Sequence, residues 1–262
     1  MTTRRILRLS GPDTRDFLQG IVTNDVGKLD QGPVYAALLT PQGKYMADFF
    51  LIADGDSVLL DVDESLGDML SQRLSMYKLR AKVTIEPSGL HLHRGTGPAP
   101  EDAVADPRHS EMGWRAYRDT PQTDDTNDWN ALRVAHLIPE TGVELTPDTF
   151  ILEAGLDRIN GLDFRKGCYV GQEVTARMKH KTELRKGLTR VEVSGSAAPG
   201  TAITAEGKPA GTLFTQAGDQ ALAHLRFDRA KGPMQADEAQ VTWPGPAACA
   251  PQNKKKPRQN RG

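Results

Sequence analysis

The sequence contains few cysteines. Only two occur in 262 residues, Cys168 and Cys249, and they lie far apart in different contexts. A disulfide framework needs more cysteines at regular spacings, so none is expected. No C-x-x-C pair occurs and the six histidines show no zinc-like spacing, which excludes the common zinc sites. Iron–sulfur clusters usually take several cysteine ligands, so this chain cannot hold one by itself.

Long apolar runs are absent as well. No stretch approaches the ~18 residues of a membrane helix, so no membrane association is expected. Residues 1–11 carry arginines but lack the apolar segment of a secretory signal, and we therefore expect a cytoplasmic protein. With 38% hydrophobic and 26% charged residues, the composition is that of a soluble globular protein, long enough for two domains or three small ones.

Negative charge is scarce in one part of the chain. The formal net charge is −1, yet residues 158–190 hold nine Lys/Arg and three Asp/Glu, a net +6 (9 − 3). Residues 252–262 add five positive charges and no negative ones. This asymmetry predicts an anion-attracting surface, or alternatively a solvated helix face followed by a polar tail. Aromatic residues are not interleaved with the basic ones, so direct nucleic-acid binding is not expected.

The pattern of apolar residues and turns predicts a mixed α and β chain. A strand at 4–9 is followed by a helix that begins near Ser10, and apolar runs on either side of residues 41–43 predict a β-hairpin. The Gly-, Pro- and Ala-rich stretch 95–107 predicts a loop or linker. The other expected elements are strands at 58–62 and 83–85, helices at 66–79, 129–137 and 170–181, and five short strands after residue 188 that indicate a small barrel or sandwich.

Polar function is concentrated around Cys168. The octapeptide there consists of Lys166, Gly167, Cys168, Tyr169, Val170, Gly171, Gln172 and Glu173. Glycines on both sides of the cysteine allow left-handed or crowded backbone conformations. A nearby lysine, and the N-terminus of a helix that starts just after the cysteine, would both favour the thiolate. The pattern is typical of a reactive thiol.

Two other interpretations of this cysteine stand beside the first. A free cysteine in a tight turn is commonly a small buried residue. A cysteine hydrolase would need a histidine base, for which His180 and His136 are candidates, although nothing in the sequence selects either one.

The octapeptide K-G-C-Y-V-G-Q-E resembles the signature of the YgfZ proteins and their mitochondrial iron–sulfur assembly relatives. Other stretches resemble the same proteins in the same order, namely residues 11–26, 38–49, 132–133, 152–154 and 174–181. The family is in turn similar to the aminomethyltransferase (T-protein) of the glycine cleavage system. The resemblance runs from about residue 5 to residue 190, and the β-rich remainder matches in character.

This resemblance implies an α+β fold of three parts around a central, folate-sized opening. The parts are two intertwined α+β units and a small C-terminal β-barrel. Mapped onto the sequence, residues 1–33 and 105–186 form the first unit, residues 34–104 the second and residues 187–246 the barrel. Independently of the resemblance, residues 247–262 are expected to be a disordered basic tail, because the C-terminal stretch is polar, broken by prolines and has nothing to bury.

The resemblance also implies a function: an accessory factor for the assembly or repair of [4Fe–4S] clusters on client enzymes, rather than a conventional enzyme. Expected partners are a monothiol glutaredoxin or an A-type carrier and the client enzymes, with only an indirect link to tRNA modification. The alternatives are a folate-dependent aminomethyl or methyl transferase and a non-catalytic regulator that binds folate or RNA. The basic stretch would attract the glutamate tail of folate, a partner protein or RNA.

The resemblance assigns the activity to Cys168. It would act as a nucleophile, as a redox thiol or as one ligand of a transient iron–sulfur cluster shared with a partner, and Lys166 would favour its thiolate. Supporting residues of the motif are Gly167, Tyr169, Gly171, Gln172, Glu173 and Arg177. The two glycines are expected to be conformational, and Glu173 with Arg177 forms either a supporting ion pair or an exposed bridge of ~0.2–1 kcal/mol.

A folate site is expected from the similarity to T-proteins, with tetrahydrofolate or a derivative as cofactor. Asp48, Arg133 and Glu153 are the candidates for lining it. T-proteins have two adjacent acids where this chain has Ala47 and Asp48, and another acid where it has Ala135. A lost carboxylate removes hydrogen bonds that orient a pterin ring, so these departures argue against aminomethyl transfer and leave weak or altered folate binding.

Overall fold

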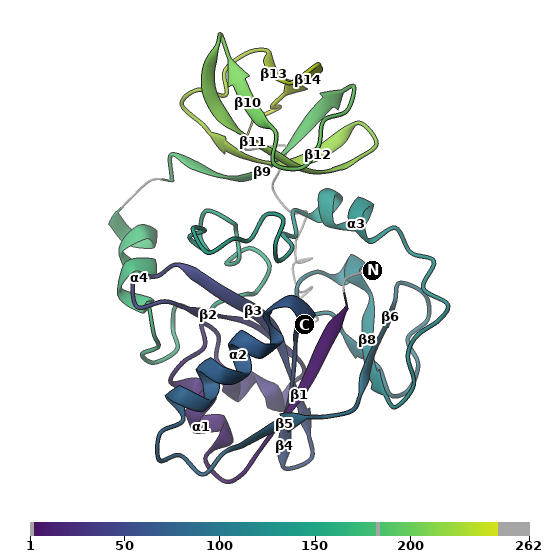
Figure 1. Cartoon of the computed structure of the whole chain (residues 1–262), viewed down its shortest axis with the longest axis vertical. Coiled ribbons are helices and arrows are strands. Elements are labelled where there is room, and N and C mark those ends of the chain that lie inside the picture. Colours follow the sequence, from purple (N-terminus) through teal and green to yellow (C-terminus); the bar gives the residue numbers. More distant parts are fainter. Residues whose placement is uncertain (1–2, 182–183, 246–262) are drawn as a thin grey trace, which may run out of the picture.

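The computed structural model describes residues 3–181 and 184–245. Figure 1 shows a larger body with a β-barrel at one end of the long axis. Cys249 and the predicted basic tail, residues 247–262, lie outside the described residues. Within the described ranges no helix is long and apolar enough to cross a membrane.

A five-stranded antiparallel sheet forms the centre of the body. Its order is β2-β3-β4-β1-β5, so the first strand of the chain pairs with the fourth and the fifth. The strands are β1 (Arg4–Ser10), β2 (Val34–Leu39), β3 (Tyr45–Asp54), β4 (Ser57–Asp63) and β5 (Thr84–Pro87). The predicted boundary between residues 33 and 34 therefore crosses one continuous sheet, because local pattern does not report which distant strand pairs with β4.

Both faces of this sheet are covered, which explains why its strands have continuous apolar runs instead of an alternating pattern. Every residue of β2 is buried. Ala36 and Leu38 belong to a core shared with α1 (Thr14–Gln19) and α2 (Glu64–Tyr77), whereas Leu39 belongs to a second core on the opposite face. The sheet thus separates two hydrophobic layers.

The segment from residue 138 to residue 171 covers the second face. It is made of turns, but its apolar side chains are buried, among them Ile138, Leu145, Ile151, Leu152, Leu156, Ile159, Leu162 and Tyr169. In Figure 1 this segment lies between the sheet and the barrel. Helix α3 (Trp129–His136) precedes it and α4 (Gln172–Lys181) follows it, so both predicted helices are present within two residues of their expected bounds.

A smaller sheet flanks the first one. Its order is β6 (His91–Gly95), β8 (Trp114–Arg118) and β7 (Val104–Ala105), with the short helix η2 (Ser110–Met112) between β7 and β8. The stretch predicted as a loop or linker thus contains a strand of this sheet. Its Gly and Pro content reflects tight connections between short strands, a pattern that sequence alone does not separate from a linker.

The C-terminal strands close into a six-stranded barrel in the order β10-β11-β12-β9-β14-β13. They are β9 (Lys186–Ser194), β10 (Ala202–Ala205), β11 (Lys208–Ala217), β12 (Gln220–Arg226), β13 (Met234–Ala236) and β14 (Ala239–Thr242). Five of the six were predicted, and the missed strand, β13, has only three residues. Val134 and Leu137 at the end of α3 pack against Leu188 and Leu222 and join the barrel to the body.

Candidate functional site

Cys168 is an exposed free thiol. It lies on the loop of residues 160–171 that joins the second core to α4. Gly167 beside it is exposed, whereas Lys166 and Tyr169 are buried. The exposure excludes the interpretation of Cys168 as a small buried residue.

The turn after α1 holds the first half of this loop. Thr23 and Asn24 are buried, and their side chains donate hydrogen bonds of 2.7 Å to the carbonyl oxygens of Gly161 and Asn160, respectively. The backbone N–H of Asp163 donates to the carbonyl oxygen of Thr23 at 3.1 Å. Buried groups that satisfy one another fix the backbone. A turn that precedes the loop by 138 residues therefore sets its conformation.

Lys166 anchors the middle of the loop. Its side chain points inward, and Nζ donates to the carbonyl oxygens of Gln19, at 2.7 Å, and of Val22. Burial lowers its pKa to about 8, although the carboxylates of Asp25 and Asp163 work in the opposite direction. These contacts are those of a residue that positions the loop. The predicted role of Lys166 in favouring the thiolate stays a prediction.

The β2–β3 hairpin supports the far end of the loop through two glycines. Gly171 has φ +82°, and a Cβ there would lie 2.6 Å from the carbonyl oxygen of Thr40. Gly43, with φ +74°, would place a Cβ 2.8 Å from that of Val174. Only glycine allows this approach, which agrees with the conformational role predicted for Gly171. A Cβ on Gly167 would meet no atom within 4 Å. Steric crowding therefore does not require a glycine at this position.

Helix α4 begins four residues after Cys168, with Gln172. The Gln172 side chain donates a long hydrogen bond, 3.5 Å, to the carbonyl oxygen of Gly167, and Thr175 donates to that of Gly171. Glu173 and Arg177 are both exposed, and the ion pairs of the described residues include none between them. The helix thus braces the loop through polar contacts at its N-terminal turn.

Three distant stretches of sequence meet at this loop. Residues 19–24 hold its first half, residues 40–43 its last glycine, and α4 continues from it. They belong to the same blocks, residues 11–26, 38–49 and 166–181, that carry the family resemblance. The fold therefore turns separated sequence blocks into one support for an exposed thiol.

Neither histidine considered as a hydrolase base contacts Cys168 among the described interactions. His136 ends α3, and its ring stacks on that of His109 with 4.0 Å between the centroids. His180 is exposed on α4. In residues 3–181 and 184–245, no three His, Cys, Asp or Glu side chains are arranged to hold a metal ion. The described site offers one thiol, and no group of three metal-binding side chains includes it.

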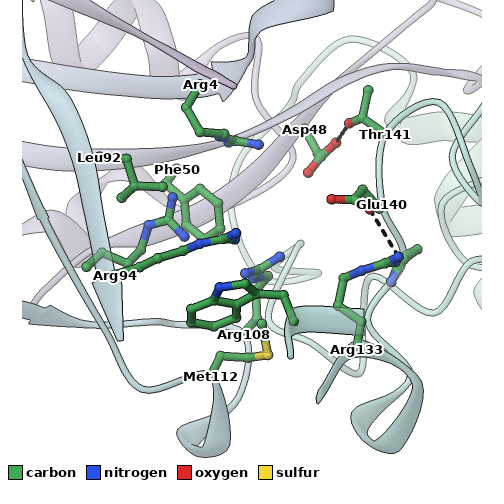
Figure 2. Close-up of a pocket in the computed structure, with 13 residues that line it drawn as sticks. Arg4, Asp48, Phe50, Leu92, Arg94, Arg108, Met112, Arg133, Glu140 and Thr141 are labelled. Carbon is green, nitrogen blue, oxygen red and sulfur yellow. Dashed lines mark hydrogen bonds and ion pairs between the residues drawn. The ribbon is translucent and has the colours of Figure 1, made fainter. Parts of the chain in front are cut away.

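A second candidate site is a pocket enclosed by the two sheets and α3 (Figure 2). Asp48 lines it and is buried; it accepts hydrogen bonds from the hydroxyls of Tyr35 (2.9 Å), Tyr45 (2.6 Å) and Thr141 (2.7 Å). Burial raises the pKa of both tyrosines well above the ordinary value, and the charge of Asp48 adds to this effect. Both tyrosines therefore stay protonated and donate to Asp48.

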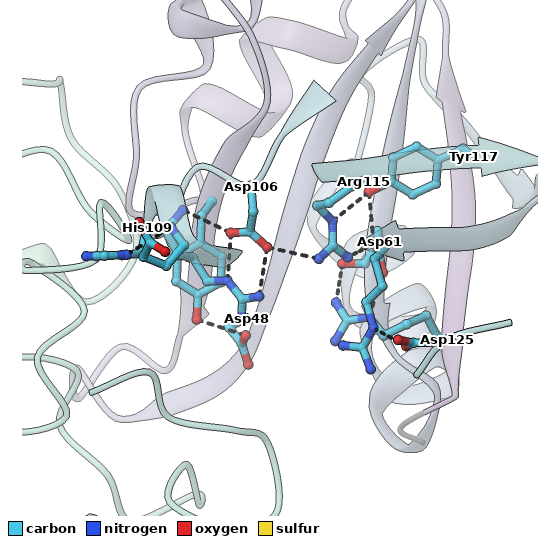
Figure 3. A network of polar contacts seen from close by, with 12 residues as sticks. Asp48, Asp61, Asp106, His109, Arg115, Tyr117 and Asp125 are labelled. Carbon is cyan, nitrogen blue, oxygen red and sulfur yellow. Dashed lines mark hydrogen bonds and ion pairs between the residues drawn. The ribbon is translucent and has the colours of Figure 1, made fainter. Parts of the chain in front are cut away.

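Arginines dominate the wall of this pocket, and only Arg133 among them was predicted from the sequence. The five that line it are Arg4, Arg94, Arg108, Arg115 and Arg133. Figure 3 shows the buried carboxylates that pair with them. Asp61 accepts from Arg4 at 2.6 Å and from Arg115, and Asp106 accepts from Arg108 at 2.8 and 3.0 Å. Burial alone would raise the pKa of Asp61, but the two guanidinium groups lower it.

The pocket does not fit a folate in this conformation. Its cavity volume is about 40 Å³, which is room for a few water molecules and not for a two-ring pterin. Asp48 already accepts three hydrogen bonds. Arg133 is paired with Glu140 and with Glu144, each at 3.0 Å. The Nε–H of Arg133 is a buried donor without a hydrogen-bond partner among the described residues, but a cavity of about 40 Å³ leaves no space for a pterin ring beside it. The geometry therefore supports no chemical step through folate.

Of the three residues predicted to line a folate pocket, the structure brings two together. Asp48 and Arg133 both border the cavity. Glu153 does not; it lies where the body meets the barrel and pairs with Lys186 at 3.2 Å and with His224 at 3.5 Å. Its predicted role in the pocket is not supported, because its carboxylate is already used at this junction.

Comparisons with known proteins place the chain in a family. Residues 185–249 match the model of the CAF17 C-terminal beta-barrel domain. The mouse mitochondrial iron–sulfur cluster assembly factor IBA57 is 35% identical over 88% of this chain and 78% of its own length. This chain belongs to the IBA57 family. The human IBA57 protein is 29% identical over 95% of the chain and 82% of its own length.

The IBA57 assignment corrects one expectation and confirms another. The mouse and human relatives are mitochondrial proteins, so the prediction of a cytoplasmic location is wrong in the light of its relatives. The glycine cleavage system aminomethyltransferase T from Bartonella henselae matches with a TM-score of 0.72, at 12% identity, over 92% of this chain and 83% of that one. The predicted T-protein-like fold with a C-terminal β-barrel is confirmed.

Proposed function

We propose that this chain is an accessory factor in the assembly of iron–sulfur clusters and that Cys168 is the residue that contacts the cluster. The observation that carries the proposal is the exposed free thiol on a loop built from three separate parts of the fold. The relatives support it, because proteins that match most of this chain are named iron–sulfur cluster assembly factors.

The number of ligands determines how the cluster is held. Cys168 is the single cysteine among the described residues, and no described group of three side chains could complete a metal site. Iron–sulfur clusters take several cysteine ligands. The cluster, a [4Fe–4S] cluster or its precursor, is therefore cargo held between Cys168 and a partner that supplies the other ligands. An A-type carrier or a monothiol glutaredoxin has this chemistry, and client enzymes receive the product.

The residues around Cys168 have separate tasks in this mechanism. The thiol loses its proton when it binds iron, because the thiolate is the metal ligand. Lys166 and Thr23 hold the loop on the body, so the thiol stays at the surface. Gly167 leaves open space beside it, with no atom within 4 Å of a Cβ at this position. A partner can therefore approach the sulfur without rearranging the loop.

A paired test decides the role of the thiol. The wild type, Cys168→Ser and Cys249→Ser are each mixed with a reduced A-type carrier, iron and sulfide, and visible circular dichroism follows the cluster. The same variants are expressed in a deletion strain, in which aconitase activity is measured under oxidative stress. We expect Cys168→Ser to lose both readouts at unchanged thermal stability and Cys249→Ser to keep both. Full activity of Cys168→Ser would overturn the proposal.

A further inference from the structure

The C-terminal end of α2 exposes two large apolar side chains. Met76 is 56% exposed and Leu79 is 86% exposed. Among the described residues, Phe164 is the one other large apolar side chain that is exposed, at 38%. Isolated apolar side chains at a surface are ordinary, but Met76 and Leu79 are neighbours at one helix end. Their exposure contributes nothing to the hydrophobic core and therefore calls for another explanation.

The two side chains belong to one continuous face. Exposed positions recur at spacings of one, three and four residues on one side of the helix: Gln72, Ser75, Met76 and Leu79. Such spacings place side chains next to one another on a helix. Beyond the helix, Nζ of Lys78 donates to the carbonyl oxygen of Val83 at 2.8 Å. This bond closes residues 78–83 into a compact turn, so the side chains of the turn lie close to the helix end.

The backbone at Leu79 is strained. Its φ is +44°, in the left-handed region that glycine and asparagine adopt more readily than leucine. Glycine is the residue that most often follows a helix in this conformation. A leucine that is both strained and exposed does not serve the stability of the fold. Strain of this kind is often found at functional sites.

The same segment is positively charged. Residues 69–85 contain four cations and no Asp or Glu: Arg73, Lys78, Arg80 and Lys82. Arg80 and Lys82 are exposed. One carboxylate from outside the segment contacts it, because Asp13 accepts the backbone N–H of Lys82 at 2.8 Å. The local charge is then +3 (4 − 1). A helix dipole favours cations at this end, which accounts for the charges but not for the exposed apolar side chains.

The acids that bound the segment are directed to other cations. Asp68, one residue before it, pairs with Arg5 on β1. Glu86, one residue after it, lies opposite Arg8 in the pairing of β1 with β5. These two carboxylates therefore do little to cancel the field of the exposed turn.

Charge restricts what can cover this face. Face-to-face pairing of two copies of the chain would bring like charges together. Residues 252–262 carry five positive charges and no negative ones, so this tail is repelled as well. The occupant is therefore anionic. A nucleic acid offers phosphates but no apolar layer, and an acidic protein would need a recess shaped for the protruding leucine. An anionic lipid surface offers both phosphates and an apolar layer beneath them.

We propose that the end of α2 and the turn of residues 78–83 bind an anionic lipid surface. Met76 and Leu79 enter the layer below the headgroups, while Arg80 and Lys82 stay at the phosphates. The sequence predicted no membrane association because it lacks a run of ~18 apolar residues, but surface binding needs no such run. α2 lies in the part of the body away from the barrel (Figure 1), so the barrel leaves this face accessible. The inference does not depend on the proposed function.

Flotation of the full-length protein with lipid vesicles tests the proposal. One set of vesicles is pure phosphatidylcholine, and the other contains about one third phosphatidylglycerol. We expect binding to the anionic vesicles to exceed binding to the neutral ones by at least about 10-fold, and to fall with added salt. Absence of binding to the anionic vesicles would overturn the proposal.

A pair of charge reversals locates the binding face. Arg80→Glu combined with Lys82→Glu should weaken binding at least about 10-fold at unchanged thermal stability, because both side chains are exposed. Lys208→Glu combined with Lys231→Glu, at two exposed barrel positions, is the matched control and should leave binding unchanged. The basic tail is present in every variant. Binding that survives the first pair would therefore belong to the tail and contradict the proposal.

A second pair tests the insertion of the apolar side chains. Met76→Gln combined with Leu79→Asn keeps every charge and should weaken binding at least about 5-fold. Thermal stability should stay the same or rise, because asparagine adopts the left-handed conformation more readily than leucine. If the charge reversals weaken binding and this pair does not, the face is attracted to any acidic surface and the assignment to lipid is wrong.

A fluorescent label reports insertion directly. A polarity-sensitive fluorophore is attached to Leu79→Cys in a Cys168→Ser, Cys249→Ser background, and to Lys208→Cys as the control. Its emission should shift to shorter wavelength on anionic vesicles at position 79 and stay constant at position 208. A label at position 79 that stays in a watery environment on bound protein would overturn the insertion.

Discussion

At the scale of single residues, Lys166 buries a cation that would otherwise be hydrated. Burial lowers its pKa to about 8, from 10.5 for an ordinary lysine. The carbonyl oxygens of Gln19 and Val22 replace part of the lost hydration. Two hydrogen bonds fix the position of the Lys166 ammonium group. The loop that carries this side chain is therefore held in place as well.

Replacing Lys166 by methionine is expected to lower the free energy of unfolding at pH 7 by about 1–3 kcal/mol, because hydrogen bonds from a charged group are lost. The folded-state pKa, about 8, lies below 10.5. Between these pH values the unfolded chain binds more protons, so the wild type gains stability as the pH rises. The Lys166→Met variant lacks this gain. The difference in the free energy of unfolding between the wild type and the variant should therefore grow from pH 8 to pH 10.

Urea unfolding at pH 7, 8 and 10 measures this difference. Lys208→Met, at an exposed barrel position, is the control and should change the free energy of unfolding by less than about 0.5 kcal/mol. If the difference for Lys166→Met shrinks from pH 8 to pH 10, the expected direction of the pH dependence is wrong.

At the scale of elements, two glycines of one motif have different tasks. Gly171 has φ +82° and lies against Thr40, whereas a side chain on Gly167 would point into open space. We expect Gly171→Ala to lower the free energy of unfolding by about 1–3 kcal/mol, because it combines a strained backbone with a clash. Gly167→Ala should change it by less than about 0.5 kcal/mol.

Thermal unfolding and the reconstitution with an A-type carrier compare the two alanine variants. Gly171→Ala should slow cluster formation because it displaces the start of α4 from the β2–β3 hairpin, and Gly167→Ala serves as its matched control. Equal effects of the two substitutions would show that the approach to Thr40 is not what requires glycine.

The same motif shows how far the sequence could predict the site. The octapeptide and its helix were predictable, because their signals are local: glycines, a cysteine and the start of an apolar period. The inward direction of Lys166 was not, because its partners Gln19 and Val22 lie more than 140 residues away. Closeness to Cys168 in sequence suggested a cation beside the thiol, whereas the loop turns the two side chains to different surroundings.

At the scale of the whole molecule, ion pairs in the wall of the arginine-lined pocket connect the two sheets of the body. Asp61 on β4 pairs with Arg4 on β1 and with Arg115 on β8, and Asp106 pairs with Arg108 and Arg115. These residues come from distant segments, and Arg108 and Arg115 gave no periodic signal in the sequence. The pocket, and its small volume in this conformation, could therefore not be predicted, while the barrel and the T-protein-like fold could.

Replacing Asp106 by asparagine is expected to lower the free energy of unfolding at pH 7 by about 3–5 kcal/mol, because the buried guanidinium group of Arg115 and the largely buried one of Arg108 lose a counter-charge. Burial would raise the pKa of Asp106, but Arg108 and Arg115 lower it to about 2, below the ordinary 3.8. The wild type therefore has this stabilisation above pH 3.8 and loses it as the pH falls towards 2.

Urea unfolding at pH 7 and at pH 3 should show that the free energies of unfolding of the wild type and Asp106→Asn differ less at the lower pH. Asp102→Asn, which removes an exposed partner of Arg118, is the control and should cost at most about 1 kcal/mol. A gap that stays constant with pH would mean that Asp106 does not stabilise the fold through its charge.

The long reach of the contacts that hold the Cys168 loop has a consequence for folding. Lys166 reaches back 147 residues to Gln19, and Thr23 pairs with Gly161 across 138 residues. Contacts of such separation are slow to form, because a long loop of chain must be closed. The thiol therefore has its supported position only after the two halves of the body have come together, so the conformation of this loop reports whether the body has folded.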